Sequence, residues 1–177
     1  ILFCNRKTEV DILAKSMKAH GLNAAPIHGD LDQRQRMQTL DGFRDGTIRF
    51  LVASDVAARG LDIPAVSHVF NFDVPSHAED YVHRIGRTGR AGKSGISVSI
   101  VTPKEVYRLR QIERILNGKV HKMDVPTGKD VCRKQFFHFI DKMLSADISH
   151  GQYEAYLPTL KEKFAAIDKE EIMQRVA

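Results

Sequence analysis

The chain has 177 residues, of which 42% are hydrophobic and 28% charged, a balance typical of one globular domain with at most a small appendage. This composition excludes a disordered chain, a collagen and a membrane protein, whose helices need about 20 apolar residues in a row. The net charge is +5, and the basic surplus lies in residues 1–117, where 17 Lys and Arg face 13 Asp and Glu, which favours a polyanionic partner for that part.

The two cysteines, Cys4 and Cys132, form neither a disulfide framework nor a metal knuckle. We therefore expect two free thiols, buried or semi-buried, in a reducing cytoplasm. The eight histidines show no metal-ligand spacing, so no zinc site is expected. No signal peptide precedes Ile1, and the abrupt strand-like start suggests that the sequence begins inside a longer protein.

Strand-like and helix-like segments alternate over the first 117 residues. Short apolar runs predict strands at 1–5, 24–28, 49–53, 66–72 and 96–101. Apolar residues at helical spacing predict helices at 8–20, 32–43, 78–85 and 104–116. This alternation indicates βαβ units and a parallel sheet, whose strands are covered on both faces and are therefore apolar throughout.

The character of the chain changes at Gly118. Residues 118–129 contain Pro126 and Gly128 and are predicted to form a linker. The remaining segment, 130–177, has no strand signal and is predicted to form a small all-α segment. Its helices are expected at 130–145, 152–167 and 170–176, with Pro158 either kinking the second helix or marking its first turn. The apolar stripes of the first two helices consist of Phe136, Phe137, Ile140, Met143 and Leu144, and of Tyr153, Tyr156, Leu157, Leu160 and Phe164.

The densest group of polar residues is segment 83–93, with the sequence His-Arg-Ile-Gly-Arg-Thr-Gly-Arg-Ala-Gly-Lys. Its cations are Arg84, Arg87, Arg90 and Lys93, and no acidic residue occurs from position 81 to position 104. Clustered guanidinium groups repel one another, and an anion bound among them offsets this repulsion. Phosphate suits such a site, because the planar guanidinium can donate two parallel hydrogen bonds to it. We therefore expect an anion-binding loop, with a solvated basic loop as the simpler alternative.

Two further polar segments follow predicted strands, where ligands bind in open α/β sheets. After the third strand, Asp55 or Asp62 is suited to receive a ribose hydroxyl, although Asp55 is equally suited to cap a helix. Residues 28–30 precede a predicted helix start, whose backbone amides are an anion site. An acidic residue acting as a plain helix cap, Asp30 or Asp32, is the simpler interpretation there.

Other motifs fail on spacing. The segment Gly92-Lys93-Ser94 lacks the glycine that a phosphate-binding loop has five residues earlier, where Arg87 stands. The G-x-G-x-x-G of a dinucleotide-binding oxidoreductase does not follow any predicted strand. No Ser-His-Asp or Cys-His arrangement is supported by spacing either.

Taken in order, these segments resemble the C-terminal RecA-like half of a bacterial DEAD-box RNA helicase over residues 1–117. The matching segments are Phe3 to Lys7 (motif IV), His28-Gly29-Asp30 with Gln33 and Arg36, Ser54 to Asp62 (motif V), and His83 to Arg90 (motif VI). Four motifs in register make the resemblance specific, although Arg6 stands where many members have Thr. The alternatives are another superfamily 2 nucleic-acid helicase and a non-catalytic RNA-binding and dimerisation module.

The resemblance implies a RecA-like fold that binds ATP and RNA against an N-terminal RecA-like domain of the same protein. In the family, that other domain carries the phosphate-binding loop, the Asp-Glu-Ala-Asp motif and the Mg²⁺ ligand, none of which occurs in this sequence. The segment is therefore expected to supply half of a composite ATP site, and to hydrolyse no ATP by itself.

By the resemblance, Arg87 and Arg90 are arginine fingers for the γ-phosphate, and Gly60 and Asp62 belong to the ATP site, with Asp62 at the ribose. His83 and Arg84 resemble the residues that couple the ATP site to the RNA site. The residues that correspond to RNA contacts, or to supports of those contacts, are Asn5, Lys7, Gly29, Arg36, Ser54 and Arg59.

Residues 130–177 more loosely resemble the helical dimerisation segment of bacterial cold-shock DEAD-box helicases. This implies a cytoplasmic protein that forms a homodimer without a membrane anchor. The expected dimer contacts are Phe136, Phe137, Ile140, Leu144, Tyr156, Leu160 and Phe164. Helices that pack on their own RecA-like domain are the alternative.

Overall fold

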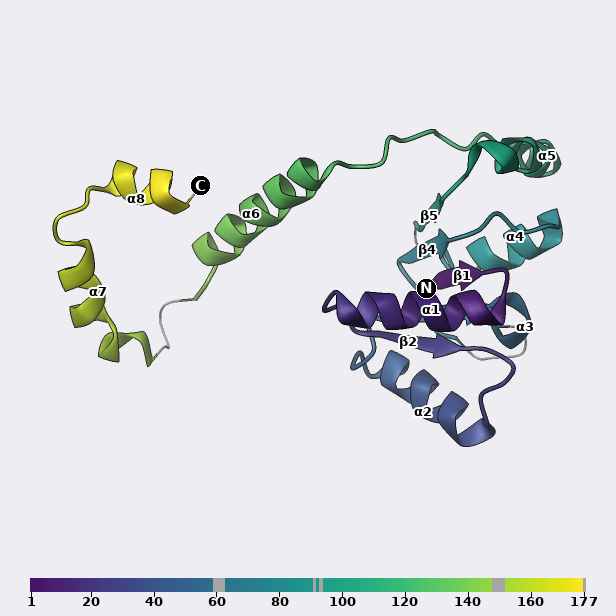
Figure 1. The fold of residues 1–177 in the computed structure, drawn as a ribbon, viewed down its shortest axis with the longest axis horizontal. Helices are drawn as coiled ribbons and strands as arrows, with labels where there is room; N and C mark the ends of the chain where they lie inside the picture. Colours follow the sequence, from purple (N-terminus) through teal and green to yellow (C-terminus); the bar gives the residue numbers. More distant parts are fainter. Residues whose placement is uncertain (59–62, 91, 93, 148–151, 177) are drawn as a thin grey trace. The chain divides into compact units, whose positions relative to one another are not determined.

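The computed structural model describes the whole chain except residues 59–62, 91, 93, 148–151 and 177. It contains two compact units, Ile1–Val120 and His121–Ala177, each described below by itself (Figure 1). Within the described residues, no helix is long and apolar enough to cross a bilayer.

The first unit is built on a sheet of five parallel strands, as the sequence predicts. The strands are β1 (Leu2–Cys4), β2 (Ala24–Ile27), β3 (Phe50–Ser54), β4 (His68–Asn71) and β5 (Ile96–Ser99). Their order in the sheet is β2-β3-β1-β4-β5, so β1 lies at the centre. The register places Phe3 beside Ala53 on β3 and Asn71 on β4. All pairs are parallel, which confirms the α/β fold class.

Helices connect the strands of this unit. They are α1 (Lys7–Ala19), α2 (Gln33–Arg44), α3 (Asp55–Ala58), α4 (Ala78–Ile85) and α5 (Val106–Leu116), the last preceded by a 3₁₀ turn at Pro103–Glu105. The simpler interpretation of Asp32 is confirmed, because its side chain caps α2 in a capping box with Gln35. The four-residue helix α3 was not predicted, because it is too short to show helical periodicity.

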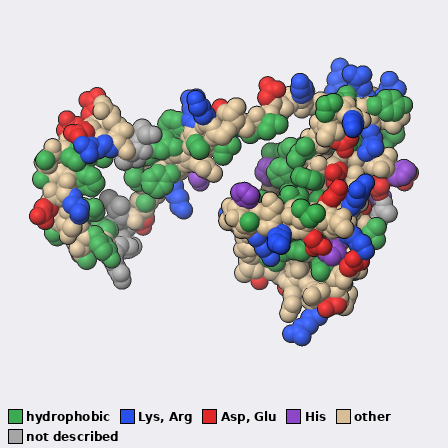
Figure 2. Space-filling view, viewed as in Figure 1, with side chains coloured by type: hydrophobic (Ala, Val, Ile, Leu, Met, Phe, Trp, Pro, Cys, Tyr) green, Lys and Arg blue, Asp and Glu red, His purple; other side chains and the backbone are tan. Residues whose placement is uncertain are grey.

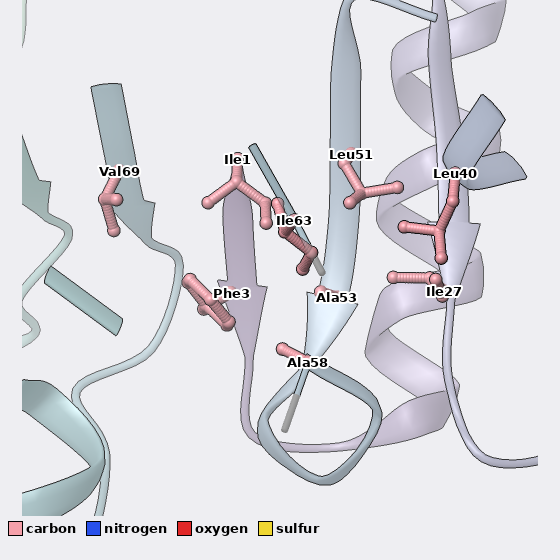
Figure 3. Packing of buried hydrophobic residues seen from close by; sticks show 9 residues of the cluster. All are labelled: Ile1, Phe3, Ile27, Leu40, Leu51, Ala53, Ala58, Ile63 and Val69. Carbon is pink, nitrogen blue, oxygen red and sulfur yellow. The ribbon is translucent and has the colours of Figure 1, made fainter. Parts of the chain in front are cut away.

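Apolar side chains pack on both faces of the sheet. On one face, nine buried residues form the cluster shown in Figure 3: Ile1, Phe3, Ile27, Leu40, Leu51, Ala53, Ala58, Ile63 and Val69. On the other face, Val10 and Ala14 of α1 pack against Cys4, Ala24 and Val52. The central strands are therefore buried on both faces, as their apolar sequence predicts.

Strand β5 departs from that expectation. It is an edge strand, and its apolar residues Ile96 and Val98 are 52% and 38% exposed. The cause is topological, since α1 packs on β1, β2 and β3, and the nearest of these, β1, lies two positions from β5. The apolar run correctly predicted a strand but not its burial.

The second unit consists of helices. They are α6 (Gly128–Leu144), α7 (Leu157–Phe164) and α8 (Lys169–Val176), with a 3₁₀ turn at Gln152–Ala155. Helix α6 begins two residues before the predicted start, because Thr127 caps it in a capping box with Asp130. Pro158 lies in the first turn of α7 rather than at a kink. Neither α6 nor α7 has a buried residue, so Cys132 on α6 is exposed and the expectation of a buried or semi-buried thiol there is wrong, whereas Cys4 is buried as expected.

Candidate functional site

Polar side chains gather where the three central strands end. Asn5 follows β1, Asp55 follows β3 and Asp73 follows β4. Because the strands are parallel, these positions lie at the same edge of the sheet, which is where open α/β sheets bind ligands. Helix α4 returns to this edge and carries Arg84 in its last turn.

Arg84 joins the three strand ends to one another. Its Nε and Nη2 donate to the two carboxylate oxygens of Asp55, each at a distance of 2.6 Å. Nη2 also donates to Oδ1 of Asn5 at 2.8 Å, and Nη1 donates to the backbone carbonyl of Asp73 at 2.8 Å. A longer contact of 3.4 Å links Nη1 to Asn71 Oδ1. Every N–H of the guanidinium therefore has an acceptor.

The burial of Arg84 changes the interpretation of the basic segment. The side chain is only 1% exposed, and its guanidinium lies 5.4 Å from the centre of the Phe3 ring. With no free donor and no exposure, it cannot bind phosphate directly, which corrects its inclusion in an anion-binding cluster. Asp55 likewise is neither a helix cap nor a free ribose ligand but the ion-pair partner of Arg84. The position of Arg84 suits a residue that fixes the motifs relative to one another.

The loop after α4 carries the remaining arginines. Arg87 is half-buried, and its Nη2 donates to the carbonyl of Ala58 at 3.3 Å. Arg90 is exposed, and its Nε donates to the carbonyl of Gly86 at 2.5 Å. Both guanidinium groups keep N–H donors for another acceptor. Burial and, secondarily, the nearby charge of Arg90 lower the pKa of Arg87.

Two contacts fix the backbone of this loop. The Thr88 hydroxyl donates to the carbonyls of Val66 and Ser67, and the carbonyl of Arg87 accepts from the backbone N–H of Val66. Gly95 lies so close to Thr88 that an added Cβ would overlap the threonine side chain and the backbone nitrogen of Gly89. The arginines are thus held by a loop that is tied to the segment before β4.

A small hollow lies between this loop and the strand ends. It is lined by Phe3, Asp55, Ala58, His83, Arg84 and Arg87. His83 is exposed on α4, next in sequence to the buried Arg84. Gly60 and Asp62, the two other residues expected at the ATP site, lie outside the described residues.

The residues expected to contact RNA differ in how available their side chains are. The Asn5 amide is occupied on both sides, since it accepts from Arg84 and donates to the carbonyl of Val74. Lys7 forms an exposed ion pair of 2.8 Å with Asp30, and this bond holds the pKa of Asp30 below its usual value.

The other residues predicted to contact RNA also differ in their exposure. Gly29 is exposed with open space where a Cβ would be, whereas Ser54 is 7% exposed. Arg36 is half-buried, and its Nε has no hydrogen-bond partner among the described residues. Arg59 lies outside the described residues.

Sequence analysis missed Asn71 and Asp73 as parts of this site, and it assigned Phe3 to a motif without a role. Asp73 carries a usable signal, because it follows the fourth strand as Asn5 follows the first, and Asn71 is the last residue of that strand. The contact of the Phe3 ring with Arg84 has no local sequence signal, because the two residues are far apart along the chain. No group of three or more His, Cys, Asp or Glu with metal-ligand geometry occurs among the described residues.

Comparison with known families decides the relationship. Residues 1–92 match the family described as "Helicase conserved C-terminal domain". The chain belongs to this helicase family. Residues 131–177 match a second family, "Probable ATP-dependent RNA helicase, helical domain". The RecA-like helicase domain inferred from the motifs and the helical segment after it are both confirmed.

Individual relatives agree with this assignment. The chain is 48% identical over 145 residues to the DEAD-box ATP-dependent RNA helicase CshA of Geobacillus kaustophilus, covering 82% of this chain and 31% of that protein. A DEAD box protein of Methanococcus jannaschii has a TM-score of 0.66 at 42% identity, over 70% of this chain and 34% of the other. Saccharomyces cerevisiae Dbp5 L327V, in a structure bound to RNA and ADP BeF3, has a TM-score of 0.64 at 33% identity. The match covers 78% of this chain and 37% of that chain. The chain thus spans between about a quarter and a third of the length of these curated relatives.

Proposed function

We propose that this chain is the C-terminal half of an ATP-dependent DEAD-box RNA helicase that remodels or unwinds RNA duplexes in the cytoplasm. In this proposal the chain consists of a RecA-like domain at residues 1–117, a linker at 118–129 and a helical segment at 130–177. The observation that carries the proposal is the pair Arg87 and Arg90, which keep free donors on a loop fixed beside the Arg84 network. The names of the relatives support ATP and RNA as ligands.

The residues at the strand ends fit a nucleotide phosphate. Arg87 and Arg90 are rigid planar donors three residues apart on one loop, and no acidic residue occurs in the sequence from position 81 to position 104. When bound, ATP would supply the γ-phosphoryl group, and Mg²⁺ would be held mainly by the N-terminal domain. Arg87 and Arg90 would stabilise the negative charge on that group during transfer, an effect of about 10³–10⁵ in rate for arginine fingers.

The Arg84 network would couple this site to RNA. Arg84 holds Asn5 and Asp55 in place, and both follow strands whose ends we assign to RNA contacts together with Lys7, Gly29 and Arg36. A shift of α4 on ATP binding would therefore be transmitted to the strand ends by hydrogen bonds of one side chain. Contacts through phosphate and 2′-hydroxyl groups would make RNA binding largely independent of sequence.

The test is RNA-stimulated ATP hydrolysis by the full-length protein carrying Arg87→Lys or Arg90→Lys. We expect loss of most turnover with an unchanged fold, because lysine keeps the charge but lacks the planar fork. Arg49→Lys, at an exposed arginine outside the loop, is the matched control. Near-normal turnover of both loop variants would contradict the proposal, and stimulation by DNA alone would favour another superfamily 2 helicase.

For the helical segment we propose a homodimer. Its support is exposed apolar area, since Phe137, Leu144 and Tyr156 are 53%, 75% and 67% exposed, and Leu160 and Phe164 are 45% and 44% exposed. Phe136 and Ile140, the other proposed contacts, are half-buried. Isolated helices of this length are marginal in water and need an apolar partner, and twofold pairing is the commonest self-association.

Light scattering after size-exclusion chromatography tests the dimer over a concentration series. A mass near that of one 20.0 kDa chain at all micromolar concentrations would contradict it. Phe137→Asp with Leu144→Asp should separate the dimer and leave the RecA-like domain folded. The same paired change at exposed polar sites, Gln135→Asp with His138→Asp, is the control and should leave the dimer intact.

A further inference from the structure

A row of basic side chains follows helix α5 and is not part of the site described above. Tyr107, Arg110 and Arg114 recur at helical spacing and share one face of the helix, and Lys104 precedes them by one turn. Lys119, just beyond the helix, lines a surface hollow together with Arg110 and Arg114. Figure 2 shows Lys and Arg side chains gathered over α5.

All five side chains of this row are exposed, and its four cations are not neutralised by the described part of the chain. The acids adjacent to it along α5, Glu105 and Glu113, accept hydrogen bonds from the Thr102 hydroxyl and from the backbone N–H of Val120. No ion pair joins a carboxylate to any of the four cations within the described ranges. The row therefore keeps its full positive charge available to a partner.

The helix dipole explains only part of this arrangement. A cation near a helix C-terminus is stabilised by the partial negative charge there, which accounts for Arg114 and Lys119. Lys104 precedes the N-terminus of α5, where the dipole disfavours a cation, and Arg110 lies in the middle of the helix. Cations along the full length of α5 therefore indicate an extended anionic partner that lies along the helix.

Tyr107 adds a second kind of contact. The ring is 70% exposed, and its hydroxyl accepts a hydrogen bond of 2.9 Å from Gln111 Nε2, which holds the ring on this face. An exposed aromatic ring beside cations offers a base-stacking surface next to phosphate contacts, a combination found in proteins that bind single-stranded nucleic acid.

We propose that this face of α5 binds the backbone of single-stranded RNA, with Arg110 and Arg114 on phosphates and Tyr107 against a base. The choice of RNA as the anion rests on the proposed function. The contact itself is separate from the residues assigned to RNA at the strand ends, so it would lengthen the track that an RNA strand follows on this domain.

The test uses fluorescence anisotropy of labelled oligouridine with this chain over a salt series, without ATP. Arg110→Gln with Arg114→Gln removes two proposed phosphate contacts. The matched control, Lys15→Gln with Lys18→Gln, removes two exposed charges from α1. Each phosphate contact on a single strand contributes about 0.7 to the slope of log affinity against log salt. We therefore expect the α5 variant to flatten the slope by about 1.4 and the α1 variant to keep it.

Two further variants separate charge from stacking. Arg110→Lys with Arg114→Lys should keep the slope, because the charge remains, and Tyr107→Ala should lower affinity without changing the slope. Equal slopes for the α5 and α1 glutamine variants would overturn the proposal, and an unchanged affinity of Tyr107→Ala would overturn its stacking contact. Because no ATP is present, neither result depends on the arginine-finger test, which judges the proposed function separately.

Discussion

Removing the charge of Asp55 should destabilise the RecA-like unit strongly, because it leaves Arg84 buried and unpaired. Arg84 is 1% exposed and donates to both carboxylate oxygens of Asp55 at 2.6 Å, while the Asp55 side chain is 23% exposed. Breaking one side of a buried ion pair costs about 3–5 kcal/mol, and the partial exposure of Asp55 favours the lower end. For Asp55→Asn we therefore expect a loss of about 3 kcal/mol, a large share of the roughly 5–15 kcal/mol that stabilises a domain.

Hydrogen exchange of the β1 and β3 amides measures this loss in the RecA-like unit alone, since these strands open only with the unit as a whole. Lys7→Gln breaks the exposed pair with Asp30 and should leave the exchange unchanged. Arg84→Met should destabilise Asp55→Asn less than it destabilises the unaltered chain, because the two residues form one interaction. A loss below about 1 kcal/mol in Asp55→Asn, or additive effects in the double variant, would refute the reasoning.

Two other predictions follow from burial and close packing. Gly95→Ala should lower the midpoint of thermal unfolding and disturb the arginine loop, because the added Cβ would overlap Thr88. Gly29→Ala is the control and should leave the midpoint unchanged, because there is open space around Gly29. Equal midpoints for the two variants would contradict this reasoning. Alkylation of the native chain at pH 8 should modify only the exposed Cys132, and intact mass should show one adduct rather than two. Burial raises the pKa of Cys4 from 9.0 to about 12, so its neutral thiol stabilises the fold below pH 9, and this contribution is lost as the pH rises towards 12.

Local patterns were enough to predict the framework of the molecule. The apolar run that became β3 and the helix at 78–85 depend on neighbours in sequence, so their positions could be predicted to within a residue or two. The motif residues were identified by resemblance to a helicase family, and the strand-end rule indicated the edge of the sheet where Arg84 binds both Asn5 and Asp55. The missed cap at Thr127 is also a local signal, so that helix start was within reach of the sequence.

The role of each cation was decided only by the tertiary structure. Arg84 and Arg87 look alike in sequence, yet one has all its donors satisfied in the interior and the other keeps donors free. The partners of Arg84 are 29 and 79 residues away, at Asp55 and Asn5, and a local pattern carries no record of contacts over such distances. The same holds for β5, whose apolar run predicts a strand but not the open edge. Secondary structure follows from short-range sterics and periodicity, whereas burial and ion pairing depend on which distant segments the fold brings together.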